Sequence, residues 1–357
     1  MTLRVVSNPP NPWRTQAVEW LGDPPPCEPR VMEEEARSIL SENESPDLGF
    51  RYSVNPYRGC FHACAYCYAR PTHEYLDLGA GTDFERVIVA KINAPELLAR
   101  AFAARTWRGE LIVFSGVTDC YQPLEASYQL TRRLLEVCRD YRNPVGIITK
   151  GPLIRRDLDL LVELARDARL SVFVSTAFAD ATLARALEPS VAAPAARFAT
   201  IRALADAGIV VGVAVAPIIP GLNDDQVPEI LTRAREAGAT RTFRNLLRLP
   251  TTVRTVFEER LRAQFPARAD RVLANLIGTR GGERLGGHGF GRRMVGQGPR
   301  WQAVDRLFAV TARRLGYDIL DEGHAHDREQ LEATTFRRPV AKGTLTQGEL
   351  FTTSSEE

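Results

Sequence analysis

Short apolar runs of strand length alternate with longer stretches that have helical periodicity over most of the chain. Such alternation is typical of βα units, in which parallel strands are joined by helices packed on the sheet. About six units in succession predict a barrel or partial barrel, although the sequence alone separates a barrel poorly from a doubly wound sheet. The predicted strands cover about residues 50–54, 87–90, 111–114, 145–149, 170–174, 209–215 and 240–247. The predicted helices cover about residues 95–105, 124–140, 157–168, 180–187, 195–207, 224–237 and 251–265.

The two ends of the chain lack this alternation, which divides it into four parts. Residues 1–46 predict an irregular N-terminal extension with one helix near 33–40. Residues 47–277 form the α/β unit, and residues 278–326 combine a Gly/Arg-rich segment with a closing helix over 301–315. Residues 327–357, rich in Thr, Glu and Gln, predict a mobile tail.

Composition and charge narrow the class of protein only slightly. Lys+Arg 46 against Asp+Glu 44 gives a net charge of +2, which by itself favours neither nucleic acid nor an anionic membrane. No apolar run approaches the ~18 residues of a membrane span, and the first residues lack the apolar core of a signal peptide. We therefore expect a cytoplasmic protein without a membrane partner.

Three of the six cysteines stand within eight residues, at Cys60, Cys64 and Cys67. Thiolates at such spacing hold a metal ion or an iron–sulfur cluster. Three ligands on a four-iron cluster would leave one iron open to a small molecule. The alternative is a structural zinc site completed by His62 or His73, but zinc sites usually draw on two separated ligand pairs.

Polar residues follow several of the predicted strands. Function in parallel α/β folds gathers at the carboxyl ends of strands, and the cysteine loop follows the first strand on the same rim. We therefore expect these loops to converge on the cysteines. The residues concerned are Ser115, Thr118, Asp119, Thr149, Lys150, Ser175, Thr176 and those between Pro217 and Asp225.

The pattern Cys60-x3-Cys64-x2-Cys67, with Tyr66 before the last cysteine, resembles the signature of the radical S-adenosylmethionine (SAM) superfamily. The resemblance implies an enzyme with a partial (β/α)6 barrel and a [4Fe–4S] cluster held by these cysteines. It also implies SAM on the open iron, reductive cleavage to a 5′-deoxyadenosyl radical and hydrogen abstraction from a substrate. A flavodoxin- or ferredoxin-like protein would donate the electron.

Further motifs are similar to the branch related to spore photoproduct lyase, within which the match is best to bacterial proteins of unassigned function. The likeness runs from about residue 45 to 315. It rests on residues 55–60, 67–71, 118–125, 149–150, 188–189, 217–224 and 291–296. The resemblance implies a substrate of unknown identity, for which a damaged or modified nucleic acid is the leading guess. The rival hypothesis is a nucleic-acid-binding protein whose cysteines form only a structural metal staple.

The same resemblance assigns roles to individual residues. Thr118, Lys150 and Ser175 match positions that contact SAM. Asn223 would contact the nucleoside or, equally, cap the helix that follows it.

Tyr66 and Tyr68 match the tyrosines that return a hydrogen atom in the lyase. The partner cysteine of the lyase falls near residues 116–117, where this chain has none. Cys120 would replace it or simply pack as a small apolar residue.

Several arginines have more than one interpretation. Arg58 and Arg70 would screen a cluster, hold an anionic substrate or form surface salt bridges. The arginines of the Gly-rich segment would bind phosphate, or pack across the open barrel with their charges solvated or paired. They are Arg280, Arg284, Arg292, Arg293 and Arg300.

Overall fold

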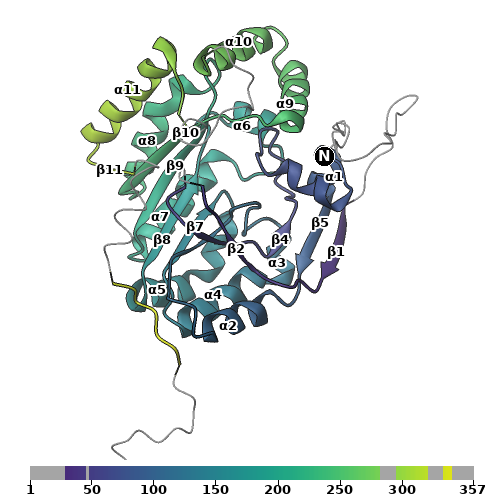
Figure 1. Ribbon diagram of the computed structural model, residues 1–357. Coiled ribbons are helices and arrows are strands. Elements are labelled where there is room, and N and C mark those ends of the chain that lie inside the picture. The colour runs from purple at the N-terminus through teal and green to yellow at the C-terminus, as the bar shows by residue number, and fades with distance from the viewer. Residues whose placement is uncertain (1–28, 46–47, 282–294, 321–332, 340–357) are drawn as a thin grey trace, which may run out of the picture.

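The computed structural model describes residues 29–45, 48–281, 295–320 and 333–339. Its main feature is a curved sheet of eight strands in the order β11-β10-β9-β8-β7-β6-β3-β2 (Figure 1). All neighbouring strands are parallel except β2 and β3. The strands are β2 (Leu40–Glu42), β3 (Tyr52–Val54), β6 (Ile112–Phe114), β7 (Val145–Thr149), β8 (Leu170–Ser175), β9 (Val211–Ile218), β10 (Arg241–Leu246) and β11 (Asp318–Ile319). The predicted α/β partial barrel is confirmed, with β3 and β6 to β10 as its six successive parallel strands.

A second, three-stranded sheet contains β1 (Arg30–Glu34), β5 (Val87–Lys91) and β4 (Tyr57–Arg58), in the order β1-β5-β4. The apolar run at 87–90 therefore forms a strand, as predicted, but outside the main parallel series. The predicted helix near residues 33–40 is wrong, because β1 ends at Glu34, β2 begins at Leu40 and residues 35–39 between them form neither helix nor strand. Its residues pair with strands distant in the sequence, and this long-range pairing overrides a helical pattern of only two turns.

Helices cover the outer, convex face of the main sheet (Figure 1). The predicted helix 124–140 is interrupted at Gln129, whose φ of 51° lies in the left-handed region. The sequence analysis did not predict α10. The helices are η1 (Arg70–Leu76), α1 (Thr82–Arg86), α2 (Ala94–Ala103), α3 (Glu125–Tyr128), α4 (Leu130–Asp140), η2 (Pro152–Asp157), α5 (Leu158–Asp167), α6 (Ala181–Leu187), α7 (Pro194–Asp206), η3 (Asp224–Gln226), α8 (Val227–Glu236), α9 (Thr251–Gln264), α10 (Ala269–Thr279) and α11 (Gly298–Arg314).

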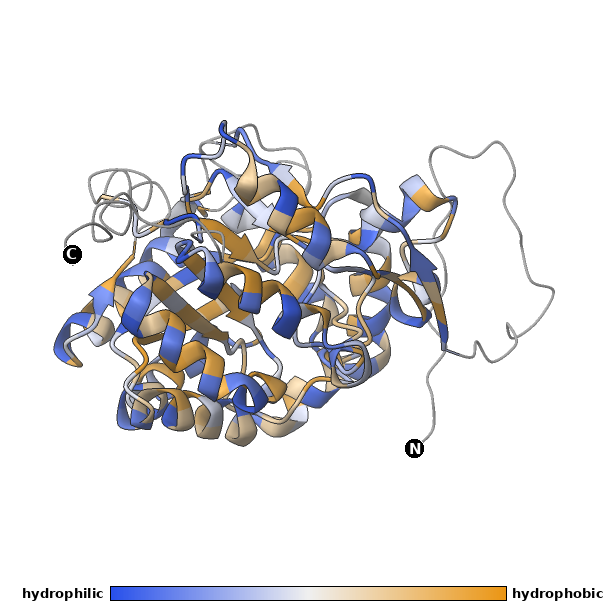
Figure 2. Cartoon of the chain, turned by 90° about the horizontal axis from the view of Figure 1, so that it is seen from below, coloured by the Kyte–Doolittle hydropathy of each residue, from blue (hydrophilic) through white to orange (hydrophobic). Residues whose placement is uncertain are grey.

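The largest hydrophobic core lies between this sheet and its helices. Alternate strand residues such as Ile147 and Val172 point toward the helices and are buried, as expected for period-2 strands. In Figure 2 the strands inside are hydrophobic and the outward-facing sides of the helices are hydrophilic. The opposite face of the sheet carries the small residues Gly146 and Gly212. The described helices include none that is both long and apolar enough to cross a bilayer.

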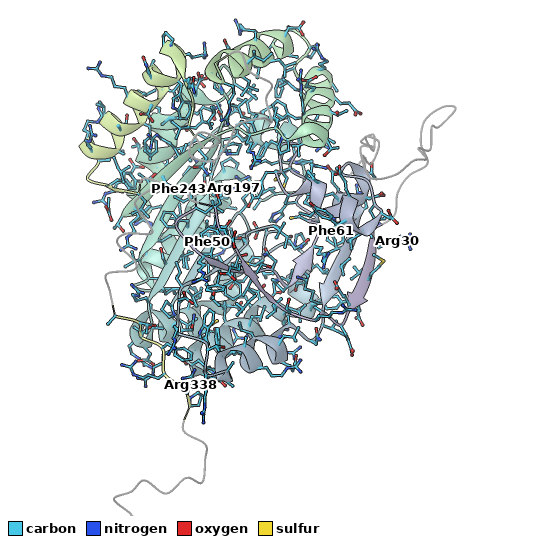
Figure 3. The ribbon with its side chains drawn as sticks, viewed as in Figure 1. Arg30, Phe50, Phe61, Arg197, Phe243 and Arg338 are labelled. Carbon is cyan, nitrogen blue, oxygen red and sulfur yellow. The ribbon has the colours of Figure 1, made fainter. Side chains whose placement is uncertain are left out.

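Part of the predicted tail packs on this core. Phe336 is only 8% exposed and stacks on Tyr141, with ring centroids 6.0 Å apart. Thr334 Oγ1 donates to the carbonyl of Gly109 at 2.6 Å. Arg338 anchors the same segment at the edge of the molecule, because its guanidinium donates to the carbonyl of Ala104 at 2.7 Å (Figure 3). The rest of the predicted tail lies outside the described residues.

Candidate iron–sulfur and SAM site

The cysteine loop, residues 59–69, connects β4 to η1 and carries all three clustered thiols. Two tight turns shape it, because Ala63 N–H donates to Cys60 O at 3.2 Å and Cys67 N–H donates to Cys64 O at 3.3 Å. Gly59 opens the loop with φ 77°, where a Cβ would lie 2.8 Å from the His73 ring and from Val87 O. Only glycine fits this left-handed position without displacing neighbours.

Two buried arginines, Arg70 and Arg260, and the carboxylate of Glu85 hold the cysteine loop in place. Arg70 is fully buried and donates to Cys64 O at 2.7 and 3.1 Å, while also contacting Glu85. Arg260 from α9 donates to Ala63 O at 3.1 Å and to the same Glu85 at 3.3 Å. Glu85 thus balances two guanidiniums whose hydrogen bonds fix the loop carbonyls.

This arrangement decides between the interpretations of the flanking arginines. Arg70 makes no surface salt bridge, since its donors are directed at carbonyls and Glu85 inside the protein. Arg58 instead forms a partly exposed ion pair with Glu34 at 3.6 Å.

Thr118 and Gln122 brace the loop from the β6 side. Thr118 Oγ1 donates to Gly59 O at 2.7 Å, and Gln122 Nε2 donates to the same carbonyl at 3.1 Å. Gln122 Oε1 also accepts the N–H of Phe61 at 2.9 Å. The sequence analysis did not single out Gln122, because a lone amide gives no signal until the fold brings it to the loop.

Asp119 and Lys150 place the end of β7 against the loop. Asp119 accepts from Thr149 Oγ1 at 2.6 Å and from Lys150 N–H at 2.7 Å. The Lys150 ammonium lies over the Tyr66 ring, 5.8 Å from its centroid. Burial would lower the pKa of Lys150, but the nearby Cys64 and Glu188 leave it raised. The predicted convergence of Lys150 and the cysteine loop is therefore present.

Tyr66 points into a buried ionic network that the sequence did not reveal. Its hydroxyl donates to Glu188 Oε1, and the other oxygen of Glu188 accepts from Arg197. Arg197 is 1% exposed and also donates to Ser175 O at 3.3 Å. Figure 3 shows Arg197 in the interior of the molecule. The network connects the cysteine loop to the end of β8.

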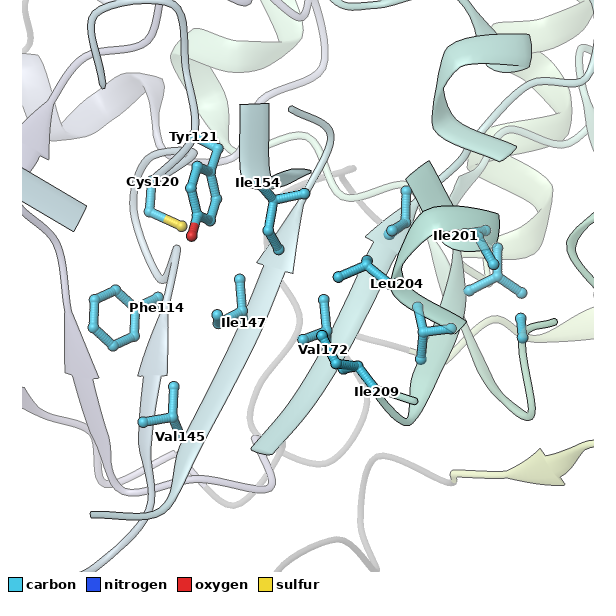
Figure 4. Close-up of a cluster of buried hydrophobic side chains, with 14 of the residues drawn as sticks. Phe114, Cys120, Tyr121, Val145, Ile147, Ile154, Val172, Ile201, Leu204 and Ile209 are labelled. Carbon is cyan, nitrogen blue, oxygen red and sulfur yellow. The ribbon is translucent and has the colours of Figure 1, made fainter. Parts of the chain in front are cut away.

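The remaining candidates occupy different environments. Tyr68 is 55% exposed, and its hydroxyl donates to Gly116 O at 2.6 Å. Ser175 Oγ donates to Ala216 O at 3.2 Å. Cys120 is fully buried in the main core beside Phe114 and Tyr121 (Figure 4).

Asn223 is saturated by backbone partners. Its Oδ1 accepts from Ile219 N–H at 2.6 Å, and its Nδ2 donates to Ala177 O at 2.7 Å and to Pro217 O at 3.0 Å. The side chain does not cap η3, which begins at the next residue. It holds the loop after β9 in shape instead.

Two of the five arginines of the Gly-rich segment fall within the described residues, and both have protein partners. Arg280 donates to Leu247 O at 2.8 Å, and burial lowers its pKa to about 10. Arg300 pairs with Asp224 at 2.9 Å. These contacts agree with packing across the open side of the barrel. Arg284, Arg292 and Arg293 lie outside the described residues.

Positively charged side chains lie near two of the three thiols, Lys150 near Cys64 and Arg70 near Cys67. Burial raises the pKa of Cys64 and of Cys67, and the positive charges of Lys150 and Arg70 oppose that rise. Burial alone would raise the pKa of Cys60, but His62 brings it below the usual value. Among the described residues, no three His, Cys, Asp or Glu side chains are grouped to hold a single metal ion. Three cysteine thiols on one short loop are the ligand type that iron–sulfur clusters take.

A protein-family comparison decides what this loop and fold belong to. The model of the Radical SAM superfamily matches residues 54–234, from the end of β3 to α8. The chain belongs to the radical SAM superfamily. Members of this superfamily hold a [4Fe–4S] cluster and SAM, and the matched region includes all three clustered cysteines.

Two similar sequences belong to proteins described as uncharacterised. An uncharacterised protein of Mycobacterium tuberculosis is 43% identical over 195 residues, which cover 54% of this chain and 57% of the relative. One of Methanocaldococcus jannaschii is 29% identical over 194 residues and 70% of its length. The match thus spans little more than half the length of the mycobacterial relative.

Solved structures of spore photoproduct lyase share the fold. The lyase complexed with dinucleoside spore photoproduct has a TM-score of 0.58 over 81% of both chains, at 15% identity. A variant of that enzyme with bound AdoMet gives the same score and coverage. At this identity the likeness shows the shared architecture.

Proposed function

We propose that this protein is a radical SAM enzyme in which Cys60, Cys64 and Cys67 hold a [4Fe–4S] cluster and SAM occupies the open iron. The observation that carries the proposal is the cysteine loop itself. Its three thiols are placed by buried hydrogen bonds on the rim of a parallel sheet, with Lys150 beside Cys64. When bound and reduced, such a cluster with SAM supplies a 5′-deoxyadenosyl radical that abstracts hydrogen.

The chain's own residues would bind and orient SAM. The Lys150 ammonium can attract a carboxylate. Ser175 donates its proton to a backbone carbonyl, so its oxygen stays available as an acceptor for ammonium or ribose hydroxyl protons. Thr118 Oγ1 donates to Gly59 O and already accepts from Gln122 Nε2 at 3.1 Å, so it would offer SAM at most its second lone pair. Asn223 has both amide hydrogens in use and would instead shape the neighbouring loop.

The tyrosines would have separate roles. Tyr66 is buried in the Glu188–Arg197 network and would position the loop. Tyr68 is exposed beside Gly116 and is the better placed of the two to meet a substrate radical. Cys120 lies within the main core, and its location favours packing over hydrogen transfer.

The substrate class is part of the proposal. The shared fold with spore photoproduct lyase, which binds a dinucleoside photoproduct, supports a nucleic-acid-derived substrate. A flavodoxin- or ferredoxin-like protein would supply the electron.

Cleavage of SAM tests the central proposal. After anaerobic reconstitution and reduction with dithionite, we expect wild-type protein to release 5′-deoxyadenosine, measured by liquid chromatography and mass spectrometry. Cys64→Ala should lose this product because an iron loses its ligand. Cys138→Ala, which changes a buried cysteine of α4 in the main core, should retain it. Wild-type protein that holds four irons yet releases no 5′-deoxyadenosine with any reductant would contradict the proposal.

A further inference from the structure

A series of buried side chains links the cysteine loop to the carboxyl end of β8. The hydroxyl of Tyr66, in the loop, donates to Glu188 Oε1, and Glu188 Oε2 accepts from Arg197 of α7. Arg197 also donates through Nη1 to Ser175 O at 3.3 Å. All four residues are at most 5% exposed. The series therefore ends, inside the protein, at one of the candidate SAM contacts.

Arg197 holds several segments at once, because its donors leave in different directions. Its Nε donates to Ala192 O at 3.0 Å, in the loop before α7. Its Nη1 reaches Ser175 O, and its Nη2 reaches the carboxylate of Glu188. A guanidinium carries its donors in a rigid plane, whereas a lysine ammonium is a compact point charge. Arg197 thus fixes Glu188 and the end of β8 relative to the start of its own helix.

Glu188 is shared between Arg197 and the cysteine loop. One carboxylate oxygen accepts from Tyr66 and the other accepts from Arg197. A backbone hydrogen bond runs beside this contact, from Ala65 N–H to Leu187 O at 2.9 Å. The loop is therefore joined to the end of α6 through two adjacent residues on each side.

The ring of Tyr66 also lies against the second candidate SAM contact. The Lys150 ammonium is 5.8 Å from the ring centroid, a distance at which the face of an aromatic ring attracts a cation. The hydrogen bond to Glu188 holds this ring by its hydroxyl, while Arg197 holds the backbone of Ser175. One buried ion pair thus acts on both candidate contacts.

We propose that Glu188 and Arg197 are positioning residues that place Lys150 and Ser175 relative to the cysteine loop as SAM binding requires. The inference rests on the proposed cluster and SAM site. Neither residue of the pair touches SAM, since each acts through Tyr66 or Ser175. Outer-shell hydrogen bonds orient the groups that hold a ligand, and at metal sites their loss typically costs about 10–100-fold in affinity or activity.

The affinity of the reconstituted, unreduced protein for SAM tests the proposal, because SAM is not cleaved in that state. Glu188→Gln keeps the size of the side chain, but its one acceptor oxygen can serve Tyr66 or Arg197 and not both. Arg197→Lys keeps the charge but loses the directed donors. We expect each variant to retain four irons and to raise the Kd for SAM by about tenfold. Equilibrium dialysis with radiolabelled SAM would measure the Kd.

A double variant shows whether the residues act as one series. Tyr66→Phe removes only the hydroxyl and should weaken SAM binding by a similar factor. Adding it to Glu188→Gln should change the Kd little further, because both substitutions interrupt the same connection. Additive losses in the double variant, or an unchanged Kd in both Glu188→Gln and Arg197→Lys, would overturn the proposal.

Tyr317→Phe is the matched control for the loss of a buried hydroxyl. Tyr317 is 7% exposed in the main core, and its hydroxyl donates to Leu231 O at 2.7 Å. A general loss of stability would affect both tyrosine variants, whereas a positioning role affects only Tyr66→Phe. The Kd for SAM should therefore match wild type in Tyr317→Phe, and an equal loss in this control would also overturn the proposal.

A second measurement uses the wild-type protein and so does not depend on a variant folding. Coupling is reciprocal, so SAM must stabilise the pair if the pair favours SAM binding. Adding SAM to the unreduced, cluster-loaded protein should slow hydrogen–deuterium exchange in residues 184–197, none of which is a candidate SAM contact. No slowing there would contradict the inference. Wild-type protein that holds four irons but does not bind SAM would instead contradict the proposed function, so the two failures are distinguishable.

Discussion

At the scale of single residues, the cysteine loop depends on charges that water does not reach. Arg70 and Arg260 share Glu85, and all three are less than 6% exposed. Buried ions are tolerated only when their partners are present, because removing one partner leaves the other desolvated and uncompensated. The geometry of the three cysteines is thus tied to an ionic network beneath them.

Replacing Arg70 tests this dependence. Arg70→Met keeps the apolar part of the side chain but removes the donors to Cys64 O, Ala80 O and Gly81 O. We expect the free energy of unfolding to fall by about 3 kcal/mol, as for a broken buried ion pair. Urea denaturation of the cluster-free protein would measure it.

Arg166→Met is the matched control for that experiment. Arg166 pairs with Asp167 at 2.8 Å, but its side chain is 71% exposed. Exposed pairs contribute roughly 0–1 kcal/mol. A loss in Arg70→Met no larger than in this control would show that the buried network does not support the loop.

At the scale of elements, the packing on the inner face of the sheet depends on a glycine, Gly212, which has no side chain. Gly212 in β9 lies under the ring of Phe173 from β8, and that ring meets Phe243 of β10 at 5.0 Å between centroids. The three adjacent strands therefore pack their inner faces by placing an aromatic ring where one of them has no Cβ.

Adding a single methyl group at this point should be costly. A Cβ on Gly212 would lie 2.2 Å from Phe173 Cε1 and 2.9 Å from Arg241 O. We expect Gly212→Ala to lower the free energy of unfolding by about 1–3 kcal/mol, the usual effect of overpacking. Thermal denaturation followed by circular dichroism would measure the change.

Gly278 provides the comparison. It lies in α10, and no atom of another element comes within 4 Å of the place that a methyl group would take. Gly278→Ala should therefore be neutral or stabilising by about 0.5–1 kcal/mol. Equal effects of the two substitutions would indicate that Phe173 moves aside freely.

At the scale of the whole molecule, stability should depend on pH through a buried histidine. Burial lowers the pKa of His73 below its ordinary value of 6.5. The unfolded chain then binds the proton more readily than the folded one, so stability must decrease as pH falls below about 6.5. The decrease ends once the pH passes the folded-state pKa.

A variant isolates this contribution. His73→Gln keeps a donor for Val87 O but cannot be protonated in this range. We expect its free energy of unfolding to change less than that of wild type between pH 7 and pH 5. Parallel urea titrations at each pH would measure both curves, and identical slopes would contradict the assignment.

Much of the fold followed from local pattern. The strands at 111–114, 145–149 and 170–174 and the helices after them are where the periodicity predicts them, because a βα unit encodes its own elements. The helix predicted at residues 33–40 failed for the opposite reason, since distant strands determine that region. The sequence also left the role of Cys120 open, because only the fold shows that this side chain lies in the main core.

The sequence by itself determined the family-specific chemistry: three cysteines at fixed spacing, followed by a series of parallel strands. Spacing along the chain is sufficient there because the ligands belong to one short loop. Only the tertiary structure decided which sheet receives β5, that Glu188 and Arg197 hold Tyr66, and that Asp119 lies 3.4 Å from His62. These pairs join residues from about 10 to more than 120 positions apart, where hydrogen bonding and burial depend on how elements pack, and no local periodicity records it.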